Sequence, residues 1–319
     1  MSEVNDVLSS DLPDADENLA KAIANFKKAG KIAESVRKDA ASLVSPGASA
    51  LDIAESVEKS IIDAGAAPGF PANISINDVA AHYTPAPDDQ LLISEKDVVK
   101  VDFGASIDGC IADNAITIDL SDEQGKLLQA AKEALDEAVS AIKPGVGNGE
   151  IGKIIETKIK SYGYKPIENL TGHKLEPYNL HAGVDVPNIS MDSDYQFQEG
   201  DVFAIEPFAS AGAGRVADQP QIEIYSVISD GKLRMRSSRE LLLKLVKDHL
   251  TLPFARRWLM RDAKSRLVAS ASLRELVNAG CLYPYPVLRD AGKGLVSQFE
   301  HTIIVEHDSA FVIDGEIKL

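Results

Sequence analysis

The chain has 319 residues, enough for one large or two average domains, and 45% of them are hydrophobic, which is ample for a buried core. Its 33 basic and 49 acidic residues give a formal net charge of −16, so the surface should repel nucleic acids and anionic lipids. The two cysteines, Cys110 and Cys281, form no Cys-x-x-Cys pair, which argues against a disulfide framework or a thiolate zinc site. No apolar run approaches the length of a membrane span, and the acidic start is the reverse of a signal peptide. We therefore expect a cytoplasmic protein with neither a nucleic acid nor a membrane as partner.

Two helices are predicted near the start of the chain. Residues 1–16 are acidic and are expected to form a flexible lead-in. From residue 17 to residue 43, apolar side chains recur at steps of three and four, the pattern of an amphipathic helix in which Gly30 is tolerated. A second helix is predicted from about residue 50 to residue 64, and strand-like segments follow to residue 119.

The second half repeats this order of two helices followed by strands. Residues 121–124 match a capping box that would open a helix to about residue 142, and a further helix is predicted over residues 148–162. Strands follow between residues 165 and 235. From about residue 238 the sequence becomes helical and basic, which indicates an insertion that interrupts a sheet; its basic residues include Arg256, Arg257, Arg261, Lys264 and Arg266.

Two aspartates in the segment VVKVDFGASIDGCIADNAITIDL are the first candidates for a functional site. The segment predicts two strands joined by a two-residue turn at Asp108-Gly109, which places residue 113 opposite residue 104. Asp102 and Asp113 would then be diagonal neighbours, roughly 7–8 Å apart on one solvent-facing side of the hairpin. A bound dication would cancel their repulsion. The alternative is a surface ladder in which Lys100 neutralises one aspartate.

Further polar residues stand in unusual contexts. Glu206 and Glu300 each lie in a strand that is otherwise largely apolar, where an unpaired carboxylate would cost several kcal/mol. A salt bridge is the plain alternative for each. His173 and His181 bracket a glycine-containing loop, and His82 precedes a proline turn; taken alone, each of these three is also explained by a structural role.

The total charge of the four candidate carboxylates suggests that they bind metal ions together. Asp102, Asp113, Glu206 and Glu300 carry −4 in total, which two divalent ions would neutralise. Because five side chains, with His173 as the fifth, are few for two ions, some carboxylates should bridge and hold the ions roughly 3.5–4 Å apart. Mostly oxygen ligands with one imidazole favour Mn²⁺, Fe²⁺ or Co²⁺, with Zn²⁺ as a further option.

These five residues, in this order, resemble the metal ligands of the methionine aminopeptidases, and the resemblance covers residues 17–319. It rests on PGFPANISINDVAAHYTP, VDFGASIDGCIAD, TGHKLEPYNLHAG, AIEPFAS and SQFEHTIIV. It implies an α/β (α+β) catalytic domain with the pita-bread fold, in which two pseudo-symmetric halves surround a dinuclear metal cleft. The helical insertion, residues 238–285 with LPFARRWL and YPYPVL, resembles the type 2 branch, and the compact length is similar to that of archaeal members.

The resemblance also implies a role for each position. Asp102 would hold one ion, Asp113 and Glu300 would bridge both, and His173 with Glu206 would complete the second. Glu206 would also shuttle protons, while His82 and His181 would contact the substrate and assist the leaving amine. A pocket for the methionine side chain would be formed by Phe70, Leu180, Tyr285 and Leu288. Ile224 stands where eukaryotic type 2 enzymes often have histidine, a departure that concerns the shape of the pocket.

The function implied is hydrolysis of the N-terminal methionine from nascent proteins and peptides whose second residue is small. A nascent chain would be the partner and the protein would act as a monomer; transient contact with the ribosome is indicated only by the basic face of residues 256–266. An Xaa-Pro peptidase of the same fold is the alternative enzyme, although such enzymes usually carry a large extra N-terminal domain. A non-enzymatic pita-bread protein is the alternative outside enzymes, but such relatives lack the ligands present here.

Overall fold

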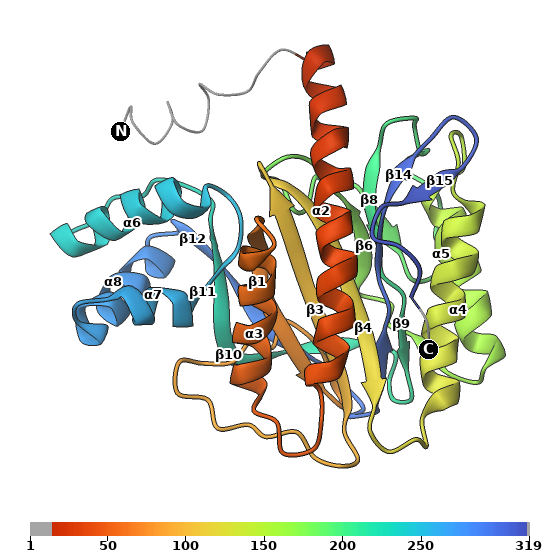
Figure 1. Cartoon of the computed structure of the whole chain (residues 1–319), viewed down its shortest axis with the longest axis horizontal. Helices are drawn as coiled ribbons and strands as arrows, with labels where there is room; N and C mark the ends of the chain where they lie inside the picture. Colours follow the sequence, from red (N-terminus) through yellow and green to blue (C-terminus); the bar gives the residue numbers. More distant parts are fainter. Residues whose placement is uncertain (1–14, 318–319) are drawn as a thin grey trace.

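The computed structural model describes residues 15–317, with side chains from Leu19 onward, so the predicted lead-in over residues 1–16 lies almost wholly outside the described residues. The first half consists of two helices packed on a three-stranded antiparallel sheet of order β1-β3-β4. In Figure 1 both helices stand in front of this sheet. The predicted helices are confirmed; the elements are α2 (Ala15–Leu43), α3 (Ala50–Asp63), β1 (Ala67–Ile76), β3 (Val98–Ile107) and β4 (Cys110–Asp119).

Gly30 in the middle of α2 has a packing role that its helical pattern does not reveal. A Cβ atom at this position would lie 2.2 Å from the carbonyl oxygen of Ile313, which belongs to the C-terminal segment. Glycine costs a helix roughly 1 kcal/mol relative to alanine. Here it allows the end of the chain to pack directly against the first long helix.

The second half again places two helices against a sheet, now with five strands in the order β15-β14-β8-β6-β7. In Figure 1 these two helices form the right-hand side of the molecule. The repeated order of elements agrees with the predicted pita-bread architecture. The elements are α4 (Gly125–Ala141), α5 (Asn148–Ser161), β6 (Thr171–Lys174), β7 (Asp185–Pro187), β8 (Val202–Ile205), β14 (His301–Val305) and β15 (Ala310–Val312).

The capping box predicted at residues 121–124 is wrong, because α4 begins only at Gly125. The carboxylate of Asp119 accepts hydrogen bonds from the backbone N–H groups of Ser121 and Gln124, at 3.0 and 2.6 Å. Asp122 has a φ of 59°, a left-handed conformation that a helix does not contain. Asp119, at the end of β4, therefore stabilises residues 121–124 as a turn, and this turn takes the place of the predicted first helical turn.

Two smaller sheets and three helices complete the fold. One sheet has the order β11-β10-β12-β2, and the other has the order β13-β9-β5. Helices α6, α7 and α8 gather on the left of Figure 1, between β10 and β12 in sequence. The elements are β2 (Val79–Ala81), β5 (Lys165–Pro166), β9 (Phe208–Ser210), β10 (Val216–Val227), α6 (Arg236–His249), β11 (Phe254–Ala255), α7 (Arg256–Asp262), α8 (Arg266–Asn278), β12 (Leu282–Asp290) and β13 (Val296–Gln298).

The β3–β4 hairpin has the predicted register, with Gly104 paired to Asp113. Its turn residues Asp108 and Gly109 have φ values of 49° and 79°, as a type I′ turn requires. The expected solvent-facing side is wrong, because Asp113 is only 4% exposed. An isolated bridge between Ala115 and Glu300 brings the second half of the chain over this face. The hairpin therefore forms one wall of an interior site.

The surface-ladder alternative for Lys100 is also wrong. Its side chain is fully buried, and Nζ donates to the carbonyl oxygens of Asn77 and Val296, at 3.1 and 2.8 Å. Within the described residues it forms no ion pair with either hairpin aspartate. Burial lowers the pKa of this lysine to about 7. Lys100 thus does not neutralise Asp102 or Asp113.

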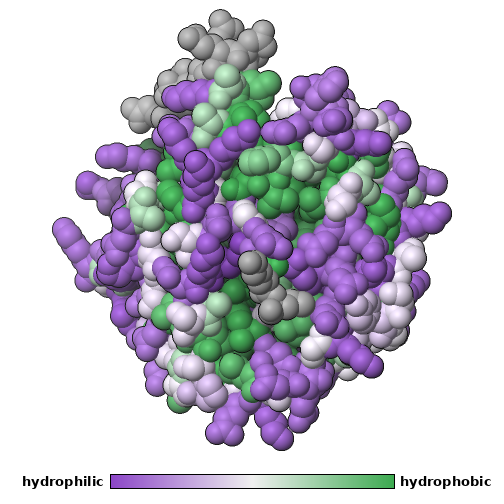
Figure 2. Space-filling view, turned by 45° about the vertical axis from the view of Figure 1, so that its right-hand side comes forward, coloured by the Kyte–Doolittle hydropathy of each residue, from purple (hydrophilic) through white to green (hydrophobic). Residues whose placement is uncertain are grey.

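The outer surface matches the acidic composition. The face drawn in Figure 2 is covered mainly by hydrophilic side chains, with hydrophobic ones visible between them. Among the helices between residues 15 and 317, none combines the length and the apolar character needed to cross a membrane.

Candidate metal centre

The five candidate ligands come from both halves of the fold and line one cavity of about 190 Å³. Asp102 lies on β3 and Asp113 on β4, while His173 lies on β6. Glu206 is in the connection between β8 and β9, and Glu300 directly precedes β14. The backbone N–H of Glu300 donates to the carbonyl oxygen of Ala115 at 3.1 Å, which fixes the two halves together at the site.

Three of these side chains converge on a common point. One donor atom each from Asp113, His173 and Glu300 lies within 4.8 Å of the others. The Nε2 atom of His173 is 3.6 Å from Oδ2 of Asp113 and 3.7 Å from Oε1 of Glu206. Two atoms that each lie about 2.1 Å from one ion are separated by roughly 3–4 Å, so these spacings suit a shared cation.

The electrostatics of the cavity also favour a cation. Burial raises the pKa of the Asp102 carboxyl to about 7. Burial, followed by the charges of neighbouring carboxylates, raises the pKa values of Asp113, Glu206 and Glu300 well above their usual range. Without a counter-charge these groups would keep protons at neutral pH. Bound divalent cations would offset this desolvation and repulsion and allow all four carboxyl groups to ionise.

The donor atoms fit a divalent metal. Oδ1 of Asp102 is buried and has no hydrogen-bond partner among the described residues. A buried unpaired carboxylate oxygen is costly unless something binds it. The set of four carboxylates and one imidazole matches the ligands that Mn²⁺, Fe²⁺, Co²⁺ and Zn²⁺ accept. The residues present therefore fit the metal site that the sequence predicts.

Three residues that the sequence analysis did not identify hold the ligands in place. Nε2 of Gln298 donates to Oε2 of Glu206 and to Oε2 of Glu300, each at 3.2 Å. Nδ2 of Asn73 lies 3.4 Å from Oδ2 of Asp102. Thr302 accepts from the backbone N–H of Asp113 and donates to its carbonyl oxygen, at 2.7 and 2.9 Å. Gln298 lies two residues before Glu300 and Thr302 two residues after it, a spacing that places side chains on the same side of an extended chain and that could have identified both.

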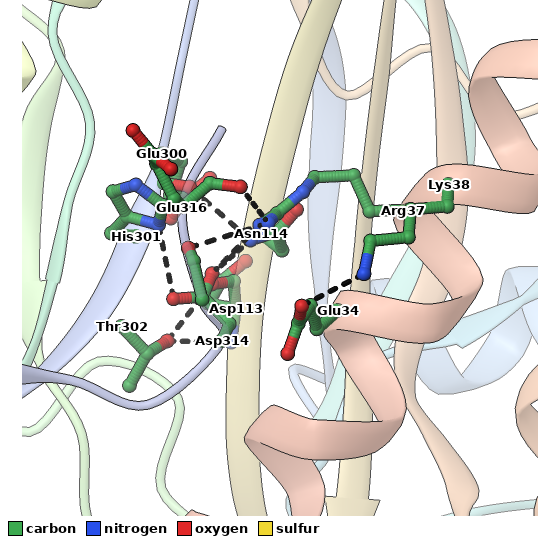
Figure 3. A network of polar contacts seen from close by, with 11 residues as sticks. Glu34, Arg37, Lys38, Asp113, Asn114, Glu300, His301, Thr302, Asp314 and Glu316 are labelled. Atoms are coloured by element: carbon green, nitrogen blue, oxygen red, sulfur yellow. Dashed lines mark hydrogen bonds and ion pairs between the residues drawn. The ribbon is translucent and has the colours of Figure 1, made fainter. Parts of the chain in front are cut away.

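A second group of polar residues lies behind the ligands. Asn114 and His301 adjoin Asp113 and Glu300 in the chain, and both contact Asp314. Figure 3 shows these residues between the ligand strands and Arg37 on α2. His301 faces away from the cavity, because its ring bonds Asp314 and it is absent from the cavity lining.

The two histidines expected to contact the substrate also face the cavity. His82 has a φ of 63°, and its Nδ1 lies 3.2 Å from the carbonyl oxygen of Pro286. His181 lies beside His173, with ring centroids 4.4 Å apart. The ring of Tyr285 lies 5.6 Å from His82 and 6.5 Å from His181. Desolvation in the cavity lowers the pKa of His82 to about 4 and also lowers that of His181, so both rings are neutral at neutral pH.

Most of the predicted methionine pocket is present. Phe70, Leu180 and Tyr285 line the cavity, and Ile224 lies there too. Leu288 does not line it: this side chain packs behind the wall, in a cluster with Ala81 and Phe208. The prediction of direct substrate contact by Leu288 is therefore not supported by its position. Further apolar lining that the sequence analysis missed comes from Phe208 and Pro253.

A larger cavity of about 740 Å³ lies elsewhere, between α3 and α6. Its lining includes none of the five ligands and neither His82 nor His181. Size alone does not identify a site of chemistry, and the five candidate ligands with both substrate histidines line the smaller cavity.

The lowered pKa of His82 predicts a pH-dependent stability. Its pKa is about 4 in the folded protein, against 6.5 for an exposed histidine. Between these values the unfolded chain binds more protons, so the contribution is complete above pH 6.5 and is lost as the pH falls toward 4. We expect His82→Asn to remove up to about 3 kcal/mol of this pH dependence. Urea unfolding of metal-loaded wild type and variant from pH 4.5 to 7 measures it, and parallel curves would contradict the prediction.

Comparison with known proteins agrees with this geometry. Residues 24–307 match the family model for metallopeptidase family M24. The chain is similar to the methionine aminopeptidase of Pyrococcus horikoshii, with 50% identity over 286 residues that cover 89% of this chain and 97% of the relative. The solved methionine aminopeptidase from Thermotoga maritima superimposes with a TM-score of 0.68 at 22% identity, over 93% of this chain and 97% of that one. The prolidase from Pyrococcus furiosus gives 0.59 at 18% identity, over 93% of this chain but 65% of the longer prolidase.

Proposed function

The chain belongs to metallopeptidase family M24 and, within it, to the methionine aminopeptidases, and we propose that two divalent ions in the small cavity support its removal of the initiator methionine from nascent proteins with a small second residue. The observation that carries this proposal is that four carboxylates and one imidazole line a single cavity, in which the buried residues Asp113, His173 and Glu300 bring their donor atoms together. One chain supplies all five donors, which supports a monomer. Cytoplasmic action is part of the proposal, because nascent chains are made there.

The proposed ligand set divides the five side chains between two ions. Asp102 would hold one ion, His173 and Glu206 would hold the other, and Asp113 and Glu300 would be shared between them; all five line the cavity. When bound, such ions polarise a carbonyl and lower the pKa of water, which provides a nucleophile at neutral pH. The central position of Asp113, near both His173 and Glu300, supports its assignment as a bridge.

The remaining steps concern protons and orientation. Glu206 is proposed to accept a proton from the attacking water and to deliver it to the leaving amine, because its carboxylate faces the cavity. His181 is neutral and faces the cavity, so it can donate an N–H to the carbonyl oxygen of the substrate. Neutral His82 donates its one N–H to Pro286, so its Nε2 is an acceptor for an N–H group of the substrate or for the leaving amine. The backbone carbonyl of Pro286 orients the His82 ring.

The apolar part of the cavity supports methionine as the cleaved residue. Phe70 packs with Ile111, Leu180 and Leu252 in a small hydrophobic cluster. Gly104 permits this arrangement, because a Cβ atom there would lie 2.6 Å from the Phe70 ring. A flexible thioether is well suited to a pocket lined by aromatic and aliphatic groups.

Replacement of His82 tests the proposed role in the reaction. Asparagine tolerates the left-handed backbone of His82, so His82→Asn should leave the fold and the metal content intact. We expect kcat on Met-Ala-Ser to fall by roughly 10²–10³-fold. His307→Asn, at an exposed position far from the cavity, should be unchanged. Near-normal kcat for His82→Asn would show that this histidine does not assist the chemistry.

A peptide comparison distinguishes the proposal from an Xaa-Pro peptidase of the same fold. Turnover of Met-Ala-Ser should greatly exceed that of Ala-Pro peptides. Faster turnover of Ala-Pro peptides would show that the chain is an Xaa-Pro peptidase. That result would contradict the proposed substrate but not the proposed metal centre.

Ribosome contact receives little support from the basic helical segment. Arg257 is buried, and Arg256, Arg261 and Arg266 each form an ion pair with a nearby acid. Paired arginines offer little free charge to a polyanion. Cosedimentation of the protein with ribosomes at physiological salt would decide whether any contact exists.

A further inference from the structure

A buried polar cluster lies directly behind two of the proposed ligands. Asp113 and Glu300 face the cavity, and the residues next to them in the chain point to the opposite side of their strands. Figure 3 shows the cluster between these strands and helix α2. Its members expose at most 4% of their surface; they are Arg37, Asn114, His301 and Asp314.

The carboxylate of Asp314 is the centre of this cluster. Its Oδ2 accepts from Nη1 of Arg37 at 3.4 Å and from Nδ2 of Asn114. Its Oδ1 lies 3.0 Å from Nδ1 of His301. One carboxylate thus contacts the residue that follows Asp113 and the residue that follows Glu300.

These contacts restrict the backbone that carries the ligands. Besides Asp314, Nδ2 of Asn114 donates to the carbonyl oxygen of Glu300 at 3.3 Å. Since adjacent side chains on an extended strand point in opposite directions, fixing Asn114 also fixes the direction of Asp113. The same argument connects His301 to Glu300.

Helix α2 holds Asp314 in this position. Nη2 of Arg37 donates to the carbonyl oxygens of Gly315 and Glu316, at 3.3 and 2.9 Å. Two turns earlier on the same helix face, Gly30 leaves room for the backbone of Ile313. The N–H of Ile313 donates to the carbonyl oxygen of Thr302, which is on the strand that follows Glu300. The C-terminal segment is therefore fastened to both α2 and β14.

We propose that Asp314, held by Arg37, is a positioning residue for Asp113 and Glu300, and that it increases the affinity of the cavity for divalent ions without touching them. The inference rests on the proposed function. Buried ion pairs contribute little net stability compared with apolar packing, so stability alone does not account for this cluster. Groups that orient metal ligands typically change metal affinity by about 10–100-fold when they are removed.

Titration of metal-free protein with Co²⁺ tests this proposal, with visible absorption and heat as the two signals. We expect Asp314→Asn to bind Co²⁺ roughly 10–100-fold more weakly and to show altered absorption bands, because the ligands are less well oriented. Lys38→Met is the matched control, since Lys38 is the neighbour of Arg37 but is exposed and forms an ion pair with Glu34. This control should bind as wild type does.

The variants also separate positioning from folding. Circular dichroism and thermal unfolding show whether Asp314→Asn is folded. If it is not, Arg37→Lys decides, because it keeps the buried charge but lacks the two-nitrogen fork that contacts Asp314 through Nη1 and the two carbonyls through Nη2. Wild-type affinity and wild-type absorption bands in a folded Asp314→Asn, or in Arg37→Lys when the former is unfolded, would overturn the inference. If wild type itself takes up no Co²⁺, the proposed function fails instead.

Discussion

Asp113→Asn is expected to lose methionine aminopeptidase activity by a factor of about 10³ or more, because a bridging ligand is worth several kcal/mol to the reaction. The same change should stabilise the metal-free protein. Burial and the neighbouring Asp102 raise the pKa of Asp113, so the metal-free protein must take up a proton there on folding at neutral pH, and the neutral amide avoids that cost. Activity and metal-free stability are therefore predicted to move in opposite directions. Met-Ala-Ser hydrolysis and urea unfolding measure the two effects.

Asp39→Asn provides the control for this prediction. Asp39 is exposed on α2 and lies outside the cavity lining, so its amide variant should match wild type in both assays. A metal-free Asp113→Asn protein that is less stable than wild type would contradict the electrostatic account. Retained activity would remove Asp113 from the proposed ligand set.

Arg257→Met is expected to lower the free energy of unfolding by about 3–5 kcal/mol, because it leaves a buried carboxylate without its partner. Arg257 on α7 pairs with Glu58 on α3, and both side chains are almost completely buried. Its guanidinium also donates to Thr84, two residues after His82. Glu58 accepts from the N–H of Ala72 on β1 at 3.1 Å, so the pair joins the helices α3 and α7 to the strand beside the cavity. The loss should therefore affect both stability and the placement of His82.

Two further variants test whether the lower free energy of unfolding is caused by the unpaired buried charge. The double variant Glu58→Met with Arg257→Met removes both charges and should recover much of the stability. Arg266→Met breaks the exposed pair with Asp88 and should cost at most about 1 kcal/mol. Equal losses for Arg257→Met and Arg266→Met in urea unfolding would show that burial does not set the strength of these pairs.

The hairpin could be predicted because it depends on a local pattern. Local patterns left each of the five ligand candidates with a structural alternative, and the resemblance to a known family joined them into one set. The Asp108-Gly109 turn determines the register of β3 and β4, and carboxylates within apolar strands indicate a functional role. Burial of Asp113 could not be predicted, since it depends on a bridge to Glu300 almost 190 residues later. The contact between Asn114 and Asp314 could not be predicted for the same reason, because it joins residues that are far apart in the sequence. The start of α4 was mispredicted because the carboxylate of Asp119 binds amides that a helix would have used.

Metal content and peptide cleavage measured together test the central claim most directly. Purified wild type, stripped of metal and then supplied with Mn²⁺ or Co²⁺, should bind two equivalents and cleave Met-Ala-Ser only when loaded. Asp102→Ala, measured in parallel, should bind less metal and lose cleavage. Wild type that gains no metal on addition, or that cleaves equally well without metal, would contradict the account.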